Sequence, residues 1–227
     1  MKYSHLLFDA DDTLFDFPKA DDQAFSIMCR LHQVPDTQET RDLYHRINQE
    51  LWSAFDRRDV SKDFVTLERY VRFFRALGLD RDATRANRDY LKALGRCNVP
   101  LPHAEAVCRE LVRRGHKLYI VTNAVASVHR SRLERSVLAE LITDAFISED
   151  AGAAKPDKAY FDYALARIPG AGAENCLVIG DSLATDIRGA NNAGLPCCWF
   201  NPHGKARQGD ITIDYEITDL RQLLDIV

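Results

Sequence analysis

Short apolar runs alternate with amphipathic segments along much of the chain. The runs lie at residues 5–8, 117–122, 145–148, 176–180, 196–200 and 215–217. A short apolar run between polar residues is typical of a strand that is buried on both faces. Amphipathic segments at 104–114 and about 127–141 separate some of these runs. This alternation predicts an α/β fold, a parallel sheet with helices on both faces and 215–217 at its edge.

The middle of the chain has a helical pattern instead. Apolar residues recur there at three- and four-residue spacing, as in Phe64, Leu67, Val71, Phe74 and Leu77. A second set runs through 43–55, and together they predict a small helical bundle inserted after the first strand. Two prolines mark 99–103 as a linker. We therefore assign 1–16 and 97–227 to a catalytic core and 17–96 to an inserted all-helical domain.

Composition narrows the possible partners. The 227 residues carry a net charge of −4, whereas proteins that bind nucleic-acid polymers usually have a basic excess. No apolar run approaches the roughly 20 residues that cross a bilayer, and the N-terminus lacks a signal-peptide layout. The six cysteines fit no zinc spacing, so we expect free thiols. We expect a cytoplasmic protein, monomeric or homodimeric, with neither a membrane nor a nucleic-acid polymer as its partner.

Residues suited to chemistry follow the predicted strands. Asp9 and Asp11 come directly after the first strand, and Thr122 ends the second. Lys155 follows the third strand, and Asp181 follows the fourth. The carboxyl ends of parallel strands meet at one edge of a sheet, where ligands gather. The sequence therefore places these side chains in one cleft, below the inserted helical domain.

The residue types in this cleft suit phosphoryl transfer. A carboxylate can attack phosphorus, and a second carboxyl group can protonate the leaving oxygen and then activate water. Magnesium prefers oxygen ligands, while threonine and backbone N–H groups can hold phosphate oxygens. A lysine can neutralise the charge that accumulates around the phosphate. The expected substrate is a small-molecule phosphate ester.

Four segments in order resemble the motifs of the haloacid dehalogenase (HAD) superfamily. They are Asp9-x-Asp11-x-Thr13, Thr122-Asn123, Lys155-Pro156 and Gly180-Asp181-x-x-x-x-Asp186. The helical insertion resembles the C1-type cap of that superfamily. The resemblance covers the whole chain and implies a Rossmann-like core that carries a helical cap domain.

The resemblance also implies a catalytic role for each matching residue. Asp9 would be the nucleophile, and Asp11 the general acid and base. Thr122 would bind the phosphoryl group together with backbone groups that include Asn123. Lys155 would steady Asp9 and the phosphate.

The metal ligands follow from the same resemblance. Asp9, Asp181 and the backbone carbonyl of Asp11 would bind Mg²⁺, with Mn²⁺ as the alternative. Asp186 would act directly or through a water molecule. Asp12 stands where the superfamily more often has glycine, and we expect no need for a positive φ there.

Further segments are similar to the bacterial pyrimidine 5′-nucleotidases of this superfamily. These segments are 8–15, 48–52, 132–135, 147–149, 154–156 and 161–165. The similarity implies Mg²⁺-dependent hydrolysis of pyrimidine nucleoside 5′-monophosphates. The main alternative is a phosphatase for another small ester, such as a sugar phosphate or phosphoglycolate. A 2-haloacid dehalogenase is disfavoured, because those enzymes generally lack the carboxylate at the position of Asp11.

Other polar and aromatic residues have two interpretations. Trp52 and Phe55 could stack on a pyrimidine ring or belong to the core of the helical domain. We expect Asp21 to face solvent or to sit at a helix N-terminus. The run from His129 to Arg132 is expected to form an exposed helix face.

Overall fold

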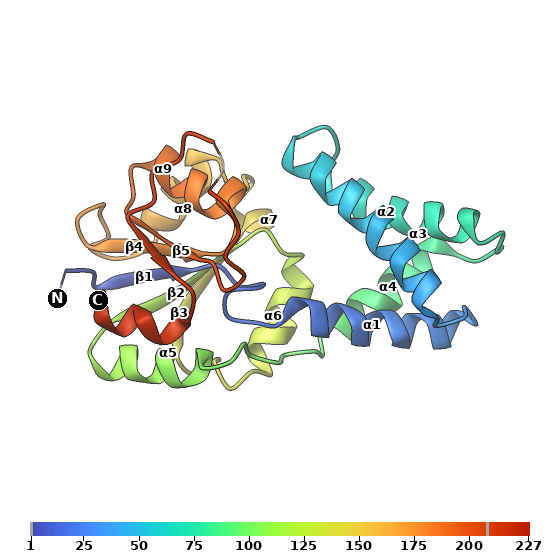
Figure 1. Cartoon of the computed structure of the whole chain (residues 1–227), viewed down its shortest axis with the longest axis horizontal. Helices are drawn as coiled ribbons and strands as arrows, with labels where there is room; N and C mark the ends of the chain where they lie inside the picture. Colours follow the sequence, from blue (N-terminus) through green and yellow to red (C-terminus); the bar gives the residue numbers. More distant parts are fainter. Residues whose placement is uncertain (1, 208) are drawn as a thin grey trace. The chain divides into compact units, whose positions relative to one another are not determined.

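The chain divides into two compact units. The computed structural model describes residues 2–207 and 209–227 (Figure 1). One unit comprises Met1–Pro18 with Asn98–Val227, and the other comprises Lys19–Cys97.

The first unit contains a parallel sheet. Its described strands have the order β3-β2-β1-β4-β5-β6, and every neighbouring pair is parallel. They are β1 (His5–Phe8), β2 (Lys117–Thr122), β3 (Ile142–Ile147), β4 (Cys176–Gly180), β5 (Cys197–Phe200) and β6 (Tyr215–Ile217). The predicted sheet, with 215–217 at its edge, is confirmed.

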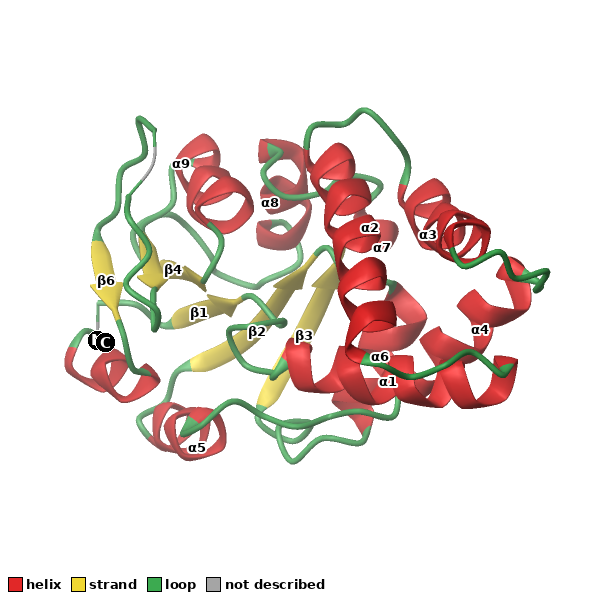
Figure 2. Cartoon of the chain, turned by 45° about the vertical axis from the view of Figure 1, so that its right-hand side comes forward, coloured by secondary structure: helices red, strands yellow, loops and turns green. Residues whose placement is uncertain are grey.

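Helices cover both faces of the sheet (Figure 2). They are α5 (Ala104–Arg113), α6 (Ala126–Glu134), α7 (Ser148–Ala151), α8 (Lys158–Leu165), α9 (Arg188–Ala193), the π-helix η1 (Leu183–Ile187) and the 3₁₀-helix η2 (Leu220–Asp225). Successive strand residues point to opposite faces. Accordingly, Leu6 and Phe8 belong to the same buried cluster as Leu111 of α5, whereas Leu7 belongs to the cluster of Phe161 on α8. Between their terminal residues the central strands are apolar, because both of their faces are buried there.

The helix predicted at about 127–141 is shorter than expected. It ends at Glu134, and β3 begins at Ile142 rather than at Ala145. Past the helix end, the Ser136 hydroxyl accepts a hydrogen bond from the Leu138 N–H at 3.1 Å. Serine side chains that bond nearby backbone groups compete with helix formation, and β-branched Ile142 favours a strand.

The second unit is a helical bundle in all its described elements. It holds α2 (Gln38–Asp56), α3 (Lys62–Ala76) and α4 (Ala83–Leu94), together with most of α1 (Phe17–His32). Thr37, Ser61 and Asp82 cap α2, α3 and α4 by accepting backbone N–H groups of the first turn. Such caps satisfy donors that have no partner within the helix, which is why each helix begins at these residues.

Asp21 is a buried residue within α1, so the expectation that it faces solvent or sits at a helix N-terminus was wrong. Its side chain is 4% exposed, and it accepts a hydrogen bond from the Tyr90 hydroxyl. Buried Arg69 lies 4.5 Å from the Tyr90 ring centre and donates to the side-chain oxygens of Asn48 and Asn87 at 3.2 and 3.0 Å. A buried charge is tolerated only with such partners.

The two chain segments that join the units are paired with each other. The Asp16 N–H donates to the Val99 carbonyl at 3.0 Å, and the Leu101 N–H donates to the Leu14 carbonyl at 2.9 Å. The proline-containing linker predicted at 99–103 therefore runs beside the segment that leaves β1. No described helix combines the length and the hydrophobicity that crossing a bilayer requires.

Candidate active site

The strand register brings the predicted site residues to one edge of the sheet. Phe8, the last residue of β1, lies opposite Ile120 of β2 and Ile179 of β4. Asp9 follows Phe8 directly, while Thr122 lies two residues beyond Ile120 and Asp181 two residues beyond Ile179. The Asp9 N–H extends the pairing by donating to the Ile179 carbonyl at 2.8 Å.

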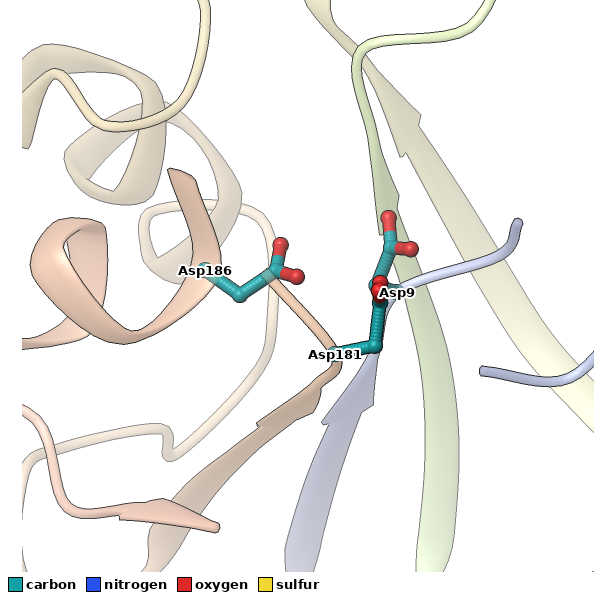
Figure 3. Close-up of side chains that lie close together, drawn as sticks. All are labelled: Asp9, Asp181 and Asp186. Atoms are coloured by element: carbon teal, nitrogen blue, oxygen red, sulfur yellow. The ribbon is translucent and has the colours of Figure 1, made fainter. Parts of the chain in front are cut away.

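Three carboxylates form an acidic triad at this edge. In the described part of the chain, one carboxylate oxygen from each of Asp9, Asp181 and Asp186 lies within 4.8 Å of the other two. Figure 3 shows Asp186 pointing from the segment after β4 toward the other two side chains. Gly180 permits this approach, because a Cβ at that position would lie 2.3 Å from an oxygen of Asp186. The triad offers the hard oxygen donors that Mg²⁺ and Mn²⁺ prefer.

Lys155 lies between two members of this triad. Its Nζ is 2.6 Å from an oxygen of Asp9 and 2.6 Å from an oxygen of Asp186, and it donates to the Val121 carbonyl at 2.8 Å. An ammonium group has three donors, and these three acceptors match them. The side chain is 2% exposed, so the ammonium group is held by protein atoms rather than by water.

Burial dominates the electrostatics of the site. It raises the pKa of Asp9 well above the ordinary value, while Lys155 acts in the opposite direction. Burial and the neighbouring charge of Asp186 raise the pKa of Asp181 to about 7. Burial disfavours the charged form of Lys155, but the carboxylates of Asp186 and Asp9 outweigh it and raise the pKa of this lysine. Three carboxylates around one ammonium group leave excess negative charge, which a divalent cation would neutralise.

Thr122 and Asn123 connect the end of β2 to Lys155. The buried Thr122 hydroxyl accepts the Ala124 N–H at 3.1 Å. The Asn123 side chain accepts the Lys155 N–H at 2.9 Å and donates to the Lys155 carbonyl at 3.0 Å. The amide group of Asn123 thus fixes the backbone of Lys155, a contact that sequence reasoning did not anticipate.

The Asp11 carboxylate lies outside the triad and pairs with Arg132 of α6. The expectation that the run from His129 to Arg132 is exposed was wrong for His129 and Arg132, each 1% exposed, whereas Arg130 between them is exposed. A hydrophobicity pattern cannot detect a helix face that buries polar groups. The spacing of these residues was the available signal in the sequence. Ala126, His129 and Arg132 recur every three residues, which places them on one face of the helix, and this face is buried.

The loop after β1 differs from expectation at Asp12. We expected no need for a positive φ there, but the φ of Asp12 is +60°. Asp12 thus adopts the left-handed conformation that glycine adopts easily. Aspartate tolerates this region better than most residues, which allows the substitution. The Asp12 N–H donates to the Phe15 carbonyl at 2.9 Å and closes the turn.

Trp52 lies on α2 in the helical unit. It is partly buried and packs edge-on against Phe55, with 5.5 Å between the ring centres. Its side chain therefore belongs only in part to the core of the helical unit.

A cavity within the first unit opens beside the triad. Its volume is about 480 Å³, which lies within the range of small-molecule pockets. The lining includes Asp181, Asp12, His203 and Lys205. Lys205 Nζ is 3.6 Å from a carboxylate oxygen of Asp181, so the cavity carries charge of both signs.

Comparison with known proteins agrees with this geometry. A family model described as haloacid dehalogenase-like hydrolase matches residues 3–194. The chain is 37% identical to the HAD-hydrolase YfnB of Bacillus subtilis, over 100% of this chain and 96% of the relative. A crystal structure of YfnB bound to magnesium has a TM-score of 0.94 at 36% identity, covering 100% of this chain and 99% of that one.

Two further relatives match over nearly their whole lengths. The chain is 33% identical to the pyrimidine 5′-nucleotidase PynA of Streptococcus pneumoniae, over 99% of this chain and 95% of the relative. It is 30% identical to the pyrimidine 5′-nucleotidase YjjG of Escherichia coli, over 98% and 97%. The chain therefore belongs to the haloacid dehalogenase-like hydrolase family and is an enzyme of the hydrolase class.

Proposed function

We propose that this enzyme is a metal-dependent phosphomonoesterase that acts through an aspartyl-phosphate. The observation that carries the proposal is the buried ammonium group of Lys155 between Asp9 and Asp186, beside the carboxylate of Asp181. In this proposal residues 1–16 with 97–227 are the catalytic core, and 17–96 are the cap domain.

In the first step, an Asp9 oxygen attacks phosphorus while the bond from phosphorus to the ester oxygen breaks. Asp11 gives its proton to the departing oxygen, which leaves as an alcohol. Lys155 favours the ionised form of Asp9 and orients it, and the Thr122 hydroxyl with the backbone N–H of Asn123 binds phosphate oxygens. The product of this step is an acyl phosphate on Asp9, the aspartyl-phosphate.

In the second step, Asp11 takes a proton from water as the water oxygen attacks phosphorus. The bond between phosphorus and Asp9 breaks, which restores the carboxylate and releases inorganic phosphate. The proton taken from water restores the acid form of Asp11 for the next ester.

The residues of the site fit a divalent cation. Asp9, Asp181 and the Asp11 backbone carbonyl would hold it, with Asp186 bound directly or through water. Mg²⁺, or Mn²⁺ in its place, would supply positive charge to the phosphate oxygens and to the crowded carboxylates.

Pyrimidine nucleoside 5′-monophosphates are the proposed substrates. Two relatives of about one third identity that match over nearly their full lengths carry the name pyrimidine 5′-nucleotidase, which supports this choice. Trp52 of the cap domain is proposed to stack on the base. Another small phosphate ester is the alternative. Dehalogenation is disfavoured because Asp11 provides a proton donor that attack on carbon does not need.

A phosphate-release screen tests the proposal. It compares pyrimidine and purine nucleoside monophosphates, sugar phosphates and phosphoglycolate, with Mg²⁺ and with a chelator. We expect activity that is lost on chelation and is highest with pyrimidine nucleotides. Full activity in the chelator would contradict the mechanism, while equal rates with purine and pyrimidine nucleotides would contradict only the proposed specificity.

The Asp9→Asn variant tests the nucleophile. It keeps the size of the side chain and removes the carboxylate that attacks phosphorus. We expect no turnover from a folded protein, verified by circular dichroism. Turnover at the wild-type rate would exclude Asp9 as the nucleophile.

A further inference from the structure

Arg132 holds the loop that carries Asp11 at two points. An Nη of its guanidinium pairs with a carboxylate oxygen of Asp11, and the guanidinium carbon lies 5.0 Å from the ring centre of Phe15. Phe15 belongs to the same tight turn, because its N–H donates to the Ala10 carbonyl at 2.9 Å. The Arg132 side chain is 1% exposed, so protein atoms fix its position.

The helix that carries Arg132 is itself tied to the phosphate-binding side of the site. Helix α6 begins four residues after Thr122, and its first N–H, at Ala126, donates to the Glu149 carboxylate at 3.2 Å. Arg132 therefore joins the loop after β1 to the segment after β2. A shift of Asp11 relative to these segments would have to break a partly buried, charge-assisted contact.

This contact also determines where the Asp11 carboxylate points. Asp9, Asp181 and Asp186 form the triad, and the Asp11 carboxylate is directed to Arg132 instead. If the Asp11 carboxylate lay beside the triad, it would repel the three carboxylates there and would occupy space that a phosphate needs. Proton transfer, in contrast, requires a carboxyl group fixed within hydrogen-bond reach of the leaving oxygen.

We propose that Arg132 is a positioning residue that fixes the Asp11 carboxylate outside the triad for proton transfer to the leaving oxygen. This inference rests on the proposed phosphatase function and adds a residue to it. Arg132 acts through Asp11 and does not touch the phosphate in this role. Its effect should therefore depend on how much the leaving oxygen needs a proton.

Two esters separate this role from a general structural one. Uridine 5′-monophosphate releases a strongly basic alkoxide oxygen, whereas p-nitrophenyl phosphate releases a stable phenolate that leaves without protonation. We expect Arg132→Met to lower kcat/KM, which reports only the steps up to formation of the aspartyl-phosphate, about 10- to 100-fold for the uridine nucleotide, part of the 10²- to 10⁴-fold effect of a general acid. The kcat/KM for p-nitrophenyl phosphate should change by less than about threefold under the same principle, because hydrolysis of the shared aspartyl-phosphate, which also uses Asp11, does not enter kcat/KM.

Two further substitutions give the experiment its controls. Arg130→Met removes another arginine–carboxylate pair from the same helix, with Asp150, but that arginine side chain is 60% exposed. It should leave both rates unchanged. Arg132→Lys keeps the positive charge without the planar fork and should restore part of the uridine rate. If Arg132→Met does not fold, the lysine variant takes its place in the two-ester comparison.

A double variant tests whether Arg132 works through Asp11. In an Asp11→Asn background, Arg132→Met should leave the ratio of the two rates unchanged. An equal loss with both esters, or no loss with either, would overturn the inference while the phosphatase function stands. If the wild-type protein releases phosphate from neither ester, the proposed function is wrong, and this inference is wrong with it.

Discussion

Replacing Lys155 with methionine removes the ammonium group between two buried carboxylates. The side chains of Lys155 and Asp186 are 2% and 1% exposed, and that of Asp9 is 11% exposed. Removal of one partner from a buried ion pair costs about 3–5 kcal/mol, because the remaining charge lies in a medium that solvates it poorly. Methionine has a similar length, so the variant leaves little empty space.

The expected loss is measurable as a lower melting temperature. One kcal/mol corresponds to about 2–4 °C in a protein of this size, so Lys155→Met should melt about 6–20 °C below wild type. The measurement is thermal unfolding at pH 8 with a chelator. Lys158→Met is the matched control, because the side chain of Lys158 is 59% exposed and its pair with Asp162 should contribute less than about 1 kcal/mol.

Acid and Mg²⁺ should both reduce this deficit. Without Lys155 the pKa of Asp9 in the folded protein rises further, so the folded state binds more protons than the unfolded state. The stability of the variant relative to wild type should therefore increase as the pH falls from 8 toward 5. Mg²⁺ should also raise the melting temperature of the variant more than that of wild type. If Lys155→Met melts within 2 °C of wild type at pH 8 in chelator, the electrostatic argument is wrong.

Three more outcomes follow from the same groups. Mg²⁺ affinity, measured by calorimetry, should fall about tenfold between pH 8 and pH 6, because Asp181, with a pKa of about 7, then binds a proton in competition with the metal; constant affinity would contradict this. Burial lowers the pKa of His129 to about 4, so the unfolded state binds more protons between pH 6.5 and 4. The free energy of unfolding should thus lose about 3 kcal/mol as the pH falls through that window, a slope that His129→Leu should lack in denaturant titrations. Gly180→Ala would place a Cβ 2.3 Å from Asp186, and should cost about 1–3 kcal/mol and weaken Mg²⁺ binding; unchanged Mg²⁺ affinity would show that Asp186 can move at no cost.

The parallel sheet and the position of Asp9 could be predicted because both depend on local pattern. Apolar runs determine the strands, and parallel strands bring their carboxyl ends to one edge. The left-handed conformation of Asp12 escaped prediction, since aspartate occupies either conformation and the turn decides between them.

The contact between Asp11 and Arg132 escaped for a different reason. It joins residues that are 121 positions apart, and only the packing of α6 against the loop after β1 creates it. Charged residues on a buried helix face carry the same hydropathy as those on an exposed face. The same limit applies to Asp21, whose partner Tyr90 is 69 positions away in the sequence.

The paired linkers give the core a property that concerns its modularity. The hydrogen bonds from Asp16 to Val99 and from Leu101 to Leu14 bring the two ends of a long excursion side by side within the first unit. Closing a loop costs an entropy that grows only slowly with its length, so a longer insert at this point adds little to the cost of folding the core. The segment between these linkers can be shortened, lengthened or exchanged while the chemistry at the sheet edge keeps its scaffold. Under the proposed function, the base-contacting segment and the residues of the mechanism therefore belong to separately replaceable parts of one chain.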